Sequence, residues 1–107
     1  MEIKKDNELY EAMHEKVMRE LLQSIYSDIK KSELIPEDEI ENLVENIGFS
    51  IGVVIDGSAE MEVSGQKVLP YLAFSESQEK RRNLIVSDTG SYFHEMVYGI
   101  TDDIDFE

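Results

Sequence analysis

The stretch LIPEDEIENLVENIGFSIGVVIDGS, residues 34–58, decides the fold, because its second half fits either a strand or a helix. As a strand, Phe49 to Ile55 shows four apolar residues in alternation. As a helix, seven apolar residues fall within an arc of about 120°: Ile40, Leu43, Val44, Ile47, Ile51, Val54 and Ile55. Pro36 followed by acids is typical of a helix start, and Asp56-Gly57 of a helix end. We therefore predict one helix from about Pro36 to Ile55.

Two glycines lie inside this predicted helix. Gly48 and Gly52 are four residues apart, so they form a flat strip on one helix face. The segment is too short and too polar for the strip to be a membrane dimer motif. We expect it to be a place of close internal packing, with this helix central to the fold.

Upstream, residues 6–31 predict a long amphipathic helix that Asp6 or Asn7 can cap. Its main apolar line recurs every fourth residue, and three further apolar residues support it. The main line is Leu9, Met13, Val17, Leu21, Ile25 and Ile29, and the supporting residues are Tyr10, Met18 and Leu22.

Downstream, the apolar period changes to two, which is typical of strands. The pattern predicts a hairpin of residues 58–63 and 68–74 with a turn at Ser64-Gly65, a loop at 75–82, a strand at 83–87 and a short helix at 91–98 that Gly99 ends. Residues 101–107 read as an acidic tail or an edge strand. We expect a single domain, 1–107, of the α+β class: one long and one central N-terminal helix packed on a small antiparallel sheet of about three strands, with a short C-terminal helix.

The composition is strongly acidic, with a net charge of −14 and a pI near 4.4. Such a chain is repelled by nucleic-acid phosphates and anionic membranes, so we expect neither as a direct partner and a basic protein instead. Cysteine is absent, which excludes disulfides and thiolate chemistry. With no apolar run long enough for a signal peptide or a membrane span, the expected location is the cytoplasm.

Chemistry is sought first around the two histidines. Ser91 and His94 could touch on a helix, but no third orienting group is evident from the sequence. His94 and Glu95 diverge by about 100°, so a regular helix cannot aim both at one metal ion. His14 lies along the apolar line of the first helix, where a hydrogen-bonded histidine at the core edge is expected. A joint site of His14 and His94 would require their helices to meet, and we predict no catalytic, metal or cofactor site.

Charge segregation gives the functional prediction. Residues 32–66 contain nine acids and residues 88–107 six, and neither range contains Lys or Arg. The basic residues gather at 4–5, 30–31 and 80–82. A negative surface of this kind can steer a basic partner. The predicted partner-binding residues are Glu37, Asp38, Glu41, Glu45, Asp56, Glu60, Glu62, His94, Glu95, Tyr98, Asp102, Asp103, Asp105 and Phe106.

The sequence thus predicts a small, acidic, non-enzymatic binding protein. It would be an inhibitor, immunity or antagonist protein that neutralises a basic partner, one version being a nucleic-acid-binding protein blocked by charge mimicry. The first alternative is a structural domain that forms homo-oligomers through its first helix. The second is a small metal-dependent enzyme using His14, His94 and Glu95.

Overall fold

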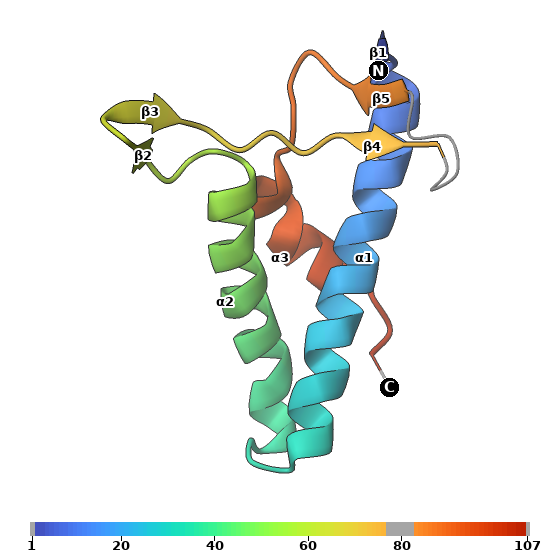
Figure 1. Ribbon diagram of the computed structural model, residues 1–107. Coiled ribbons are helices and arrows are strands. Elements are labelled where there is room, and N and C mark those ends of the chain that lie inside the picture. The colour runs from blue at the N-terminus through green and yellow to red at the C-terminus, as the bar shows by residue number, and fades with distance from the viewer. Residues whose placement is uncertain (1, 77–82, 107) are drawn as a thin grey trace.

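The computed structural model describes residues 2–76 and 83–106, and it confirms the α+β class. The described strands all lie at one end of the helices (Figure 1). In chain order the helices and strands are β1 (Glu2–Lys5), α1 (Asn7–Ser32), α2 (Glu37–Ile55), β2 (Met61–Val63), β3 (Gln66–Val68), β4 (Phe74–Ser75), β5 (Asn83–Val86) and α3 (Phe93–Asp103).

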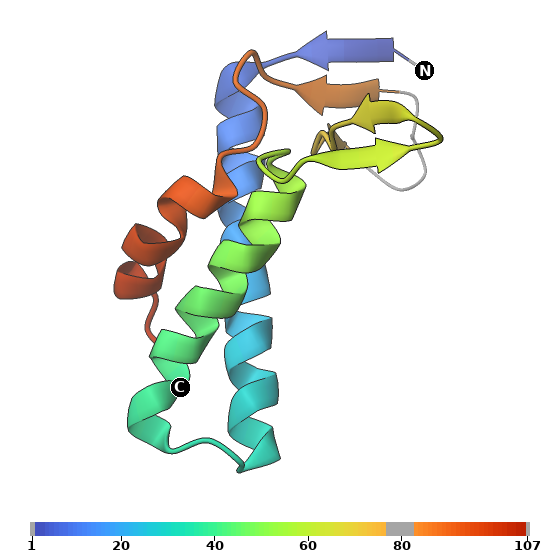
Figure 2. The same cartoon turned by 90° about the vertical axis from the view of Figure 1, so that its left-hand side faces the viewer.

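The first two helices form an antiparallel pair, and α3 packs against both of them (Figures 1 and 2). The Asp6 carboxylate caps α1 by accepting the Leu9 N–H at 3.1 Å, and Glu33 ends the helix in a left-handed conformation. The core lies where the three helices meet. It consists of Met18, Leu22, Tyr26, Ile40, Val44, Phe93, Val97, Ile100 and Ile104.

The prediction that residues 36–55 form one helix is confirmed, since α2 continues to Ile55. Its buried positions are Ile40, Val44, Gly48 and Gly52, each four residues from the next. A methyl group on Gly52 would lie 2.7 Å from the His94 backbone nitrogen. The glycine strip is therefore a site of close internal packing, as expected, because it lets the backbones of α2 and α3 approach.

The line of α1 residues that is buried in the core differs from the main apolar line predicted from the sequence. The buried residues of this helix are Tyr10, His14, Met18, Leu22 and Tyr26, whereas Val17 is 39% exposed. Two lines with a period of four run side by side on this helix, about 100° apart. The position of α2 and α3 selects the line that contains the histidine.

The strands pair differently from the predicted single antiparallel sheet. β1, which was not predicted, pairs in parallel with β5, and β4 pairs antiparallel with β5. β2 and β3 form a separate two-stranded hairpin that extends beside the end of α2 (Figure 1). The predicted second hairpin strand, 68–74, is thus divided: Val68 ends β3, which pairs with β2, whereas Phe74 begins β4, which joins the other sheet. Part of the predicted loop, residues 77–82 with its basic run, lies outside the described residues.

The C-terminal helix is longer than predicted. Gly99 does not end it, because it keeps a helical backbone and α3 continues to Asp103. The following residues are neither an edge strand nor a free tail in the described part of the chain. Ile104 is buried, and Phe106 stacks on Tyr26 with ring centroids 4.6 Å apart. Tertiary packing of these two apolar side chains therefore ties the acidic end to α1.

Within residues 2–76 and 83–106, none of the helices combines the length and apolarity that crossing a membrane requires.

Candidate functional site

Asp56, directly after α2, holds the beginning of α3. One carboxylate oxygen accepts the Ser91 hydroxyl, and the other accepts the His94 backbone N–H at 2.8 Å and contacts His94 Nδ1 at 2.5 Å. The N-cap residue of α3, Tyr92, makes no side-chain cap of its own. Asp56 therefore supplies the missing cap from another helix, where a carboxylate also meets the positive end of the helix dipole.

The chain of hydrogen bonds continues to α1. Ser91 Oγ lies 2.9 Å from Nε2 of His14, whose side chain is buried. Because the ionised carboxylate only accepts hydrogen bonds, Ser91 donates to Asp56 and its oxygen accepts from His14 Nε2–H. The network thus assigns the proton of neutral His14 to Nε2. His14, Ser91, Asp56 and His94 form one unit, called here the His–Ser–Asp–His network, which joins all three helices.

A tight turn before α3 positions Ser91 in this network. Gly90 has a φ of 65°, in the left-handed region that glycine adopts without strain, and its N–H donates to Ser87 Oγ at 3.0 Å. Tyr71, in the connection between β3 and β4, donates its hydroxyl to the Ser87 carbonyl at 2.6 Å. The serine is therefore held by a hydrogen-bonded turn rather than by the regular helix expected from the sequence.

Burial and hydrogen bonding act in opposite directions on the two ionisable groups inside the network. Burial lowers the pKa of His14 below its ordinary value of 6.5, although the negative charges of Asp56 and Glu11 partly offset that effect. Burial by itself would raise the pKa of Asp56, but the hydrogen bonds from Ser91 and His94 outweigh it and the pKa is lowered. At neutral pH the network therefore holds a neutral His14 and an ionised Asp56.

This protonation predicts a loss of stability in mild acid. Between pH 6.5 and the lower pKa of folded His14, the unfolded chain binds a proton that the folded chain does not, so the free energy of unfolding falls as the pH falls. His14→Gln, which keeps an N–H donor for Ser91, is expected to flatten this part of the curve. Urea unfolding of both proteins between about pH 7.5 and pH 5 measures the slope. Equal slopes in this range would contradict the assignment.

The order of the hydrogen bonds differs from that of a hydrolytic triad. In such a triad serine gives its proton to histidine, and the carboxylate orients the histidine. Here Ser91 lies between His14 and Asp56 and donates to the carboxylate. The third group that the sequence did not reveal is present, but its position fits a structural junction better than an activated nucleophile.

Next to the His–Ser–Asp–His network, with which it shares His94, α2 and α3 present a surface with carboxylates at one end and aromatic rings at the other. Its members are spaced by four residues on each helix, and they are named here the α2–α3 strip: Glu41, Glu45 and Phe49 of α2 with His94, Tyr98 and Asp102 of α3. Phe49 contacts the rings of both His94 and Tyr98, with centroids 5.8 and 5.9 Å apart. Phe49 and Tyr98 are 36% and 45% exposed.

The acidic end of the strip lacks compensating charge. Partial burial raises the pKa of Glu45, and the negative charges of Asp102 and Glu41 raise it further. No ion pair to these three carboxylates occurs within residues 2–76 and 83–106. Like charges are thus held together at the junction of two helices, which costs stability unless a cation binds there.

The other predicted partner-binding residues are distributed over the molecule. Asp56 differs most from the prediction, because its side chain is only 1% exposed and is satisfied internally. Glu37 is paired with Lys30 and Asp103 with Arg19, and Phe106 packs on Tyr26. The remaining ones are exposed at separate places: Asp38 in the first turn of α2, Glu60 and Glu62 at the hairpin, Glu95 on α3 and Asp105 after it.

Five of the six residues of the strip are among the partner-binding residues predicted from the sequence. The sequence did not show that these five are neighbours. It missed Phe49, which the sequence placed only in the apolar segment from Phe49 to Ile55. It also missed the network, because His14, Asp56 and Ser91 are far apart in the chain. The one sequence signal was the histidine on the apolar line of the first helix.

Comparison of the chain with protein-family models, with curated proteins and with solved structures finds no match. Among the described residues, no group of three or more His, Cys, Asp or Glu side chains is placed to hold a metal ion. The α2–α3 strip and the His–Ser–Asp–His network are therefore the features of the molecule that bear on its function.

Proposed function

We propose that this protein is a small, non-enzymatic binding protein that binds a basic protein partner through the α2–α3 strip. The observation that carries the proposal is the convergence of Glu41, Glu45 and Asp102 next to two exposed aromatic rings. A monomer gains nothing from uncompensated carboxylates held at one place. A basic partner would neutralise them.

The partner's chemistry follows from the two ends of the strip. The carboxylates suit Lys or Arg side chains, which they can bind through charge-assisted hydrogen bonds. The exposed rings of Phe49 and Tyr98 suit the apolar stems of the same side chains, or a cation placed over a ring. Aromatic side chains surrounded by polar residues are also typical energetic centres of protein interfaces. A basic surface with projecting Arg or Lys residues is the best complement.

An inhibitory or antagonist role is the form of this function that the charge favours. A net charge of −14 on 107 residues attracts basic surfaces over a distance and speeds encounter. A basic surface that normally binds nucleic acid would be covered by such a partner. The hydrogen-bond order in the network, with Ser91 committed to Asp56, supports the non-enzymatic part of the proposal.

The alternative of self-association through the first helix has less support. The buried line of α1 is already covered by α2 and α3 within one chain. Among the large apolar side chains described on α1, only Val17 is exposed, at 39%. A single exposed valine does not provide the apolar area that a stable dimer needs.

The experiment compares two variants that each lose two carboxylates and so have equal net charge. The strip variant is Glu45→Gln with Asp102→Asn, and the control is Glu60→Gln with Glu62→Gln on the exposed hairpin. Each protein is immobilised and used to capture partners from an extract of the cells that make it, with elution from about 50 mM to about 500 mM salt.

We expect a basic protein to bind the natural chain and the control, and to be lost or eluted at much lower salt from the strip variant. The strip variant should remain folded, because its substitutions relieve repulsion between like charges. Two results would contradict the proposal: equal loss of the partner from both variants, or a captured partner whose elution does not depend on salt.

A further inference from the structure

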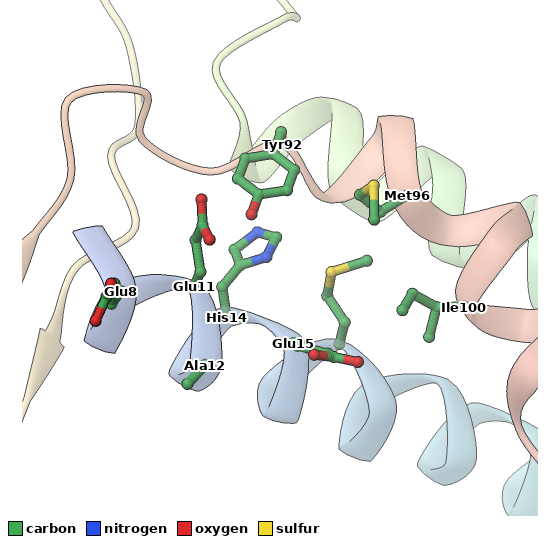
Figure 3. Close-up of a pocket in the computed structure, with 9 residues that line it drawn as sticks. Glu8, Glu11, Ala12, His14, Glu15, Tyr92, Met96 and Ile100 are labelled. Carbon is green, nitrogen blue, oxygen red and sulfur yellow. The ribbon is translucent and has the colours of Figure 1, made fainter.

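A groove lies between α1 and α3, on a different part of the molecule from the α2–α3 strip. Its volume is about 450 Å³, and its lining includes Glu8, Glu11, Glu15, Tyr92, Met96 and Ile100 (Figure 3). None of the members of the strip belongs to this lining. Cavities of roughly 300–1,000 Å³ are of the size that holds small molecules.

The two walls of the groove have different chemistry. The α1 wall presents three carboxylates, and Glu8 and Glu15 are seven residues apart, which spans about 10 Å along a helix. The α3 wall presents Tyr92, Met96 and Ile100, each four residues from the next, so an apolar line runs along the acidic one. Figure 3 shows the Glu11 carboxylate beside the His14 ring and close to the Tyr92 hydroxyl.

Cations are scarce in this groove. The residues that line it, all within the described part of the chain, include no Lys or Arg. Arg19 reaches one oxygen of Glu15 at 3.0 Å from outside the lining, whereas Glu8 and Glu11 have no ion pair among the described residues. His14 adds no positive charge at neutral pH, since burial lowers its pKa. Burial and the charges of Glu11 and Glu15 raise the pKa of Tyr92, so its hydroxyl stays protonated as a donor.

We propose that the α1–α3 groove binds a linear aliphatic polyamine, with ammonium groups on the carboxylates of α1 and methylene segments along Tyr92, Met96 and Ile100. Consecutive carboxylates are three or four residues apart, which corresponds to about 5 Å along the helix and matches ammonium groups separated by a few methylenes. The occupant is a small molecule rather than a helix of a partner, because a helix is about 10 Å wide and cannot enter a volume of this size.

The test is calorimetric titration of the full chain with spermidine at low ionic strength. Hexaamminecobalt(III) serves as a probe of equal charge that has no methylene chain. The groove variant is Glu8→Gln with Glu11→Gln, and Glu60→Gln with Glu62→Gln again serves as the control of equal net charge. Met96→Ser tests the apolar wall, because Met96 is 41% exposed there and its loss removes methylene contacts without changing charge.

We expect one spermidine per chain, about tenfold weaker binding to the groove variant, and less than about twofold change in the control. Met96→Ser should also weaken spermidine, and the cobalt complex should bind less tightly than spermidine. Equal affinity for the two cations, or equal losses in groove variant and control, would overturn the proposal.

This result is separable from that for the basic partner. The strip variant should keep spermidine binding, and the groove variant should keep the captured protein. Failure of the groove proposal would therefore appear only in spermidine binding, and failure of the strip proposal only in the capture of the basic protein.

Discussion

Asp56→Ala is expected to lower the free energy of unfolding by about 3 kcal/mol. The substitution removes the carboxylate that caps α3 and leaves the Ser91 hydroxyl and the His94 backbone N–H without their acceptor. Both groups lie in a part-buried environment, where an unmade hydrogen bond costs more than a formed one gains. His14, whose partner is Ser91, is also left in an incomplete network.

Chemical denaturation at pH 7 measures this effect, with Asp105→Ala as the matched control. Asp105 is exposed after α3, so its loss should change stability by no more than about 0.5 kcal/mol. Asp56→Asn keeps one acceptor oxygen and the shape of the side chain, and it should fall between the alanine variant and the natural chain. If Asp56→Ala were no more costly than Asp105→Ala, the junction would not be what holds α3.

Gly52→Ala is expected to destabilise the protein by about 3 kcal/mol, at the upper end of the usual cost of overpacking. The added methyl group would lie 2.7 Å from the backbone nitrogen and 2.9 Å from Cα of His94. These atoms belong to the backbone and cannot rotate away. The start of α3 must therefore move away from α2, which also stretches the contacts between Asp56 and His94.

Gly99→Ala, in α3, is expected to have the opposite effect on stability. Nothing lies within 4 Å of a methyl group built on Gly99, and its backbone is helical. Alanine should therefore stabilise the protein by up to about 1 kcal/mol, the difference in helix propensity. Thermal unfolding of the two variants side by side should shift the midpoints in opposite directions. A raised midpoint for both variants would show that helix propensity, and not the close approach of the two helices, dominates at Gly52.

The effects expected for Asp56→Ala and Gly52→Ala bear on both proposed binding sites. α3 contributes His94, Tyr98 and Asp102 to the α2–α3 strip and Tyr92, Met96 and Ile100 to the groove. Its position depends on Asp56 and Gly52, which touch neither proposed ligand. A variant that displaces α3 is therefore expected to weaken both kinds of binding together, whereas carboxylate substitutions within one site affect that site alone.

The sequence by itself determined which segments are helical and where two of them come close. Apolar spacing identified α1 and α2, and the spacing of Gly48 and Gly52 identified a flat face, because these signals depend only on the period of the helix and on side-chain size. It also predicted that His14 belongs at the edge of the core. For α3 it predicted a helix that starts two residues too early and ends at Gly99, whereas α3 begins at Phe93 and Gly99 is tolerated inside it.

Only the tertiary structure decided which carboxylates meet and which are buried. Glu45 and Asp102, far apart in the chain, face each other because α2 and α3 run antiparallel, and Asp56 turns inward because the open end of α3 needs an acceptor. The parallel pairing of β1 with β5 was equally invisible, since each strand is only four residues long. A count of acids along the chain gives the charge, but long-range packing alone determines whether each carboxylate faces solvent, a like charge or a hydrogen-bond donor.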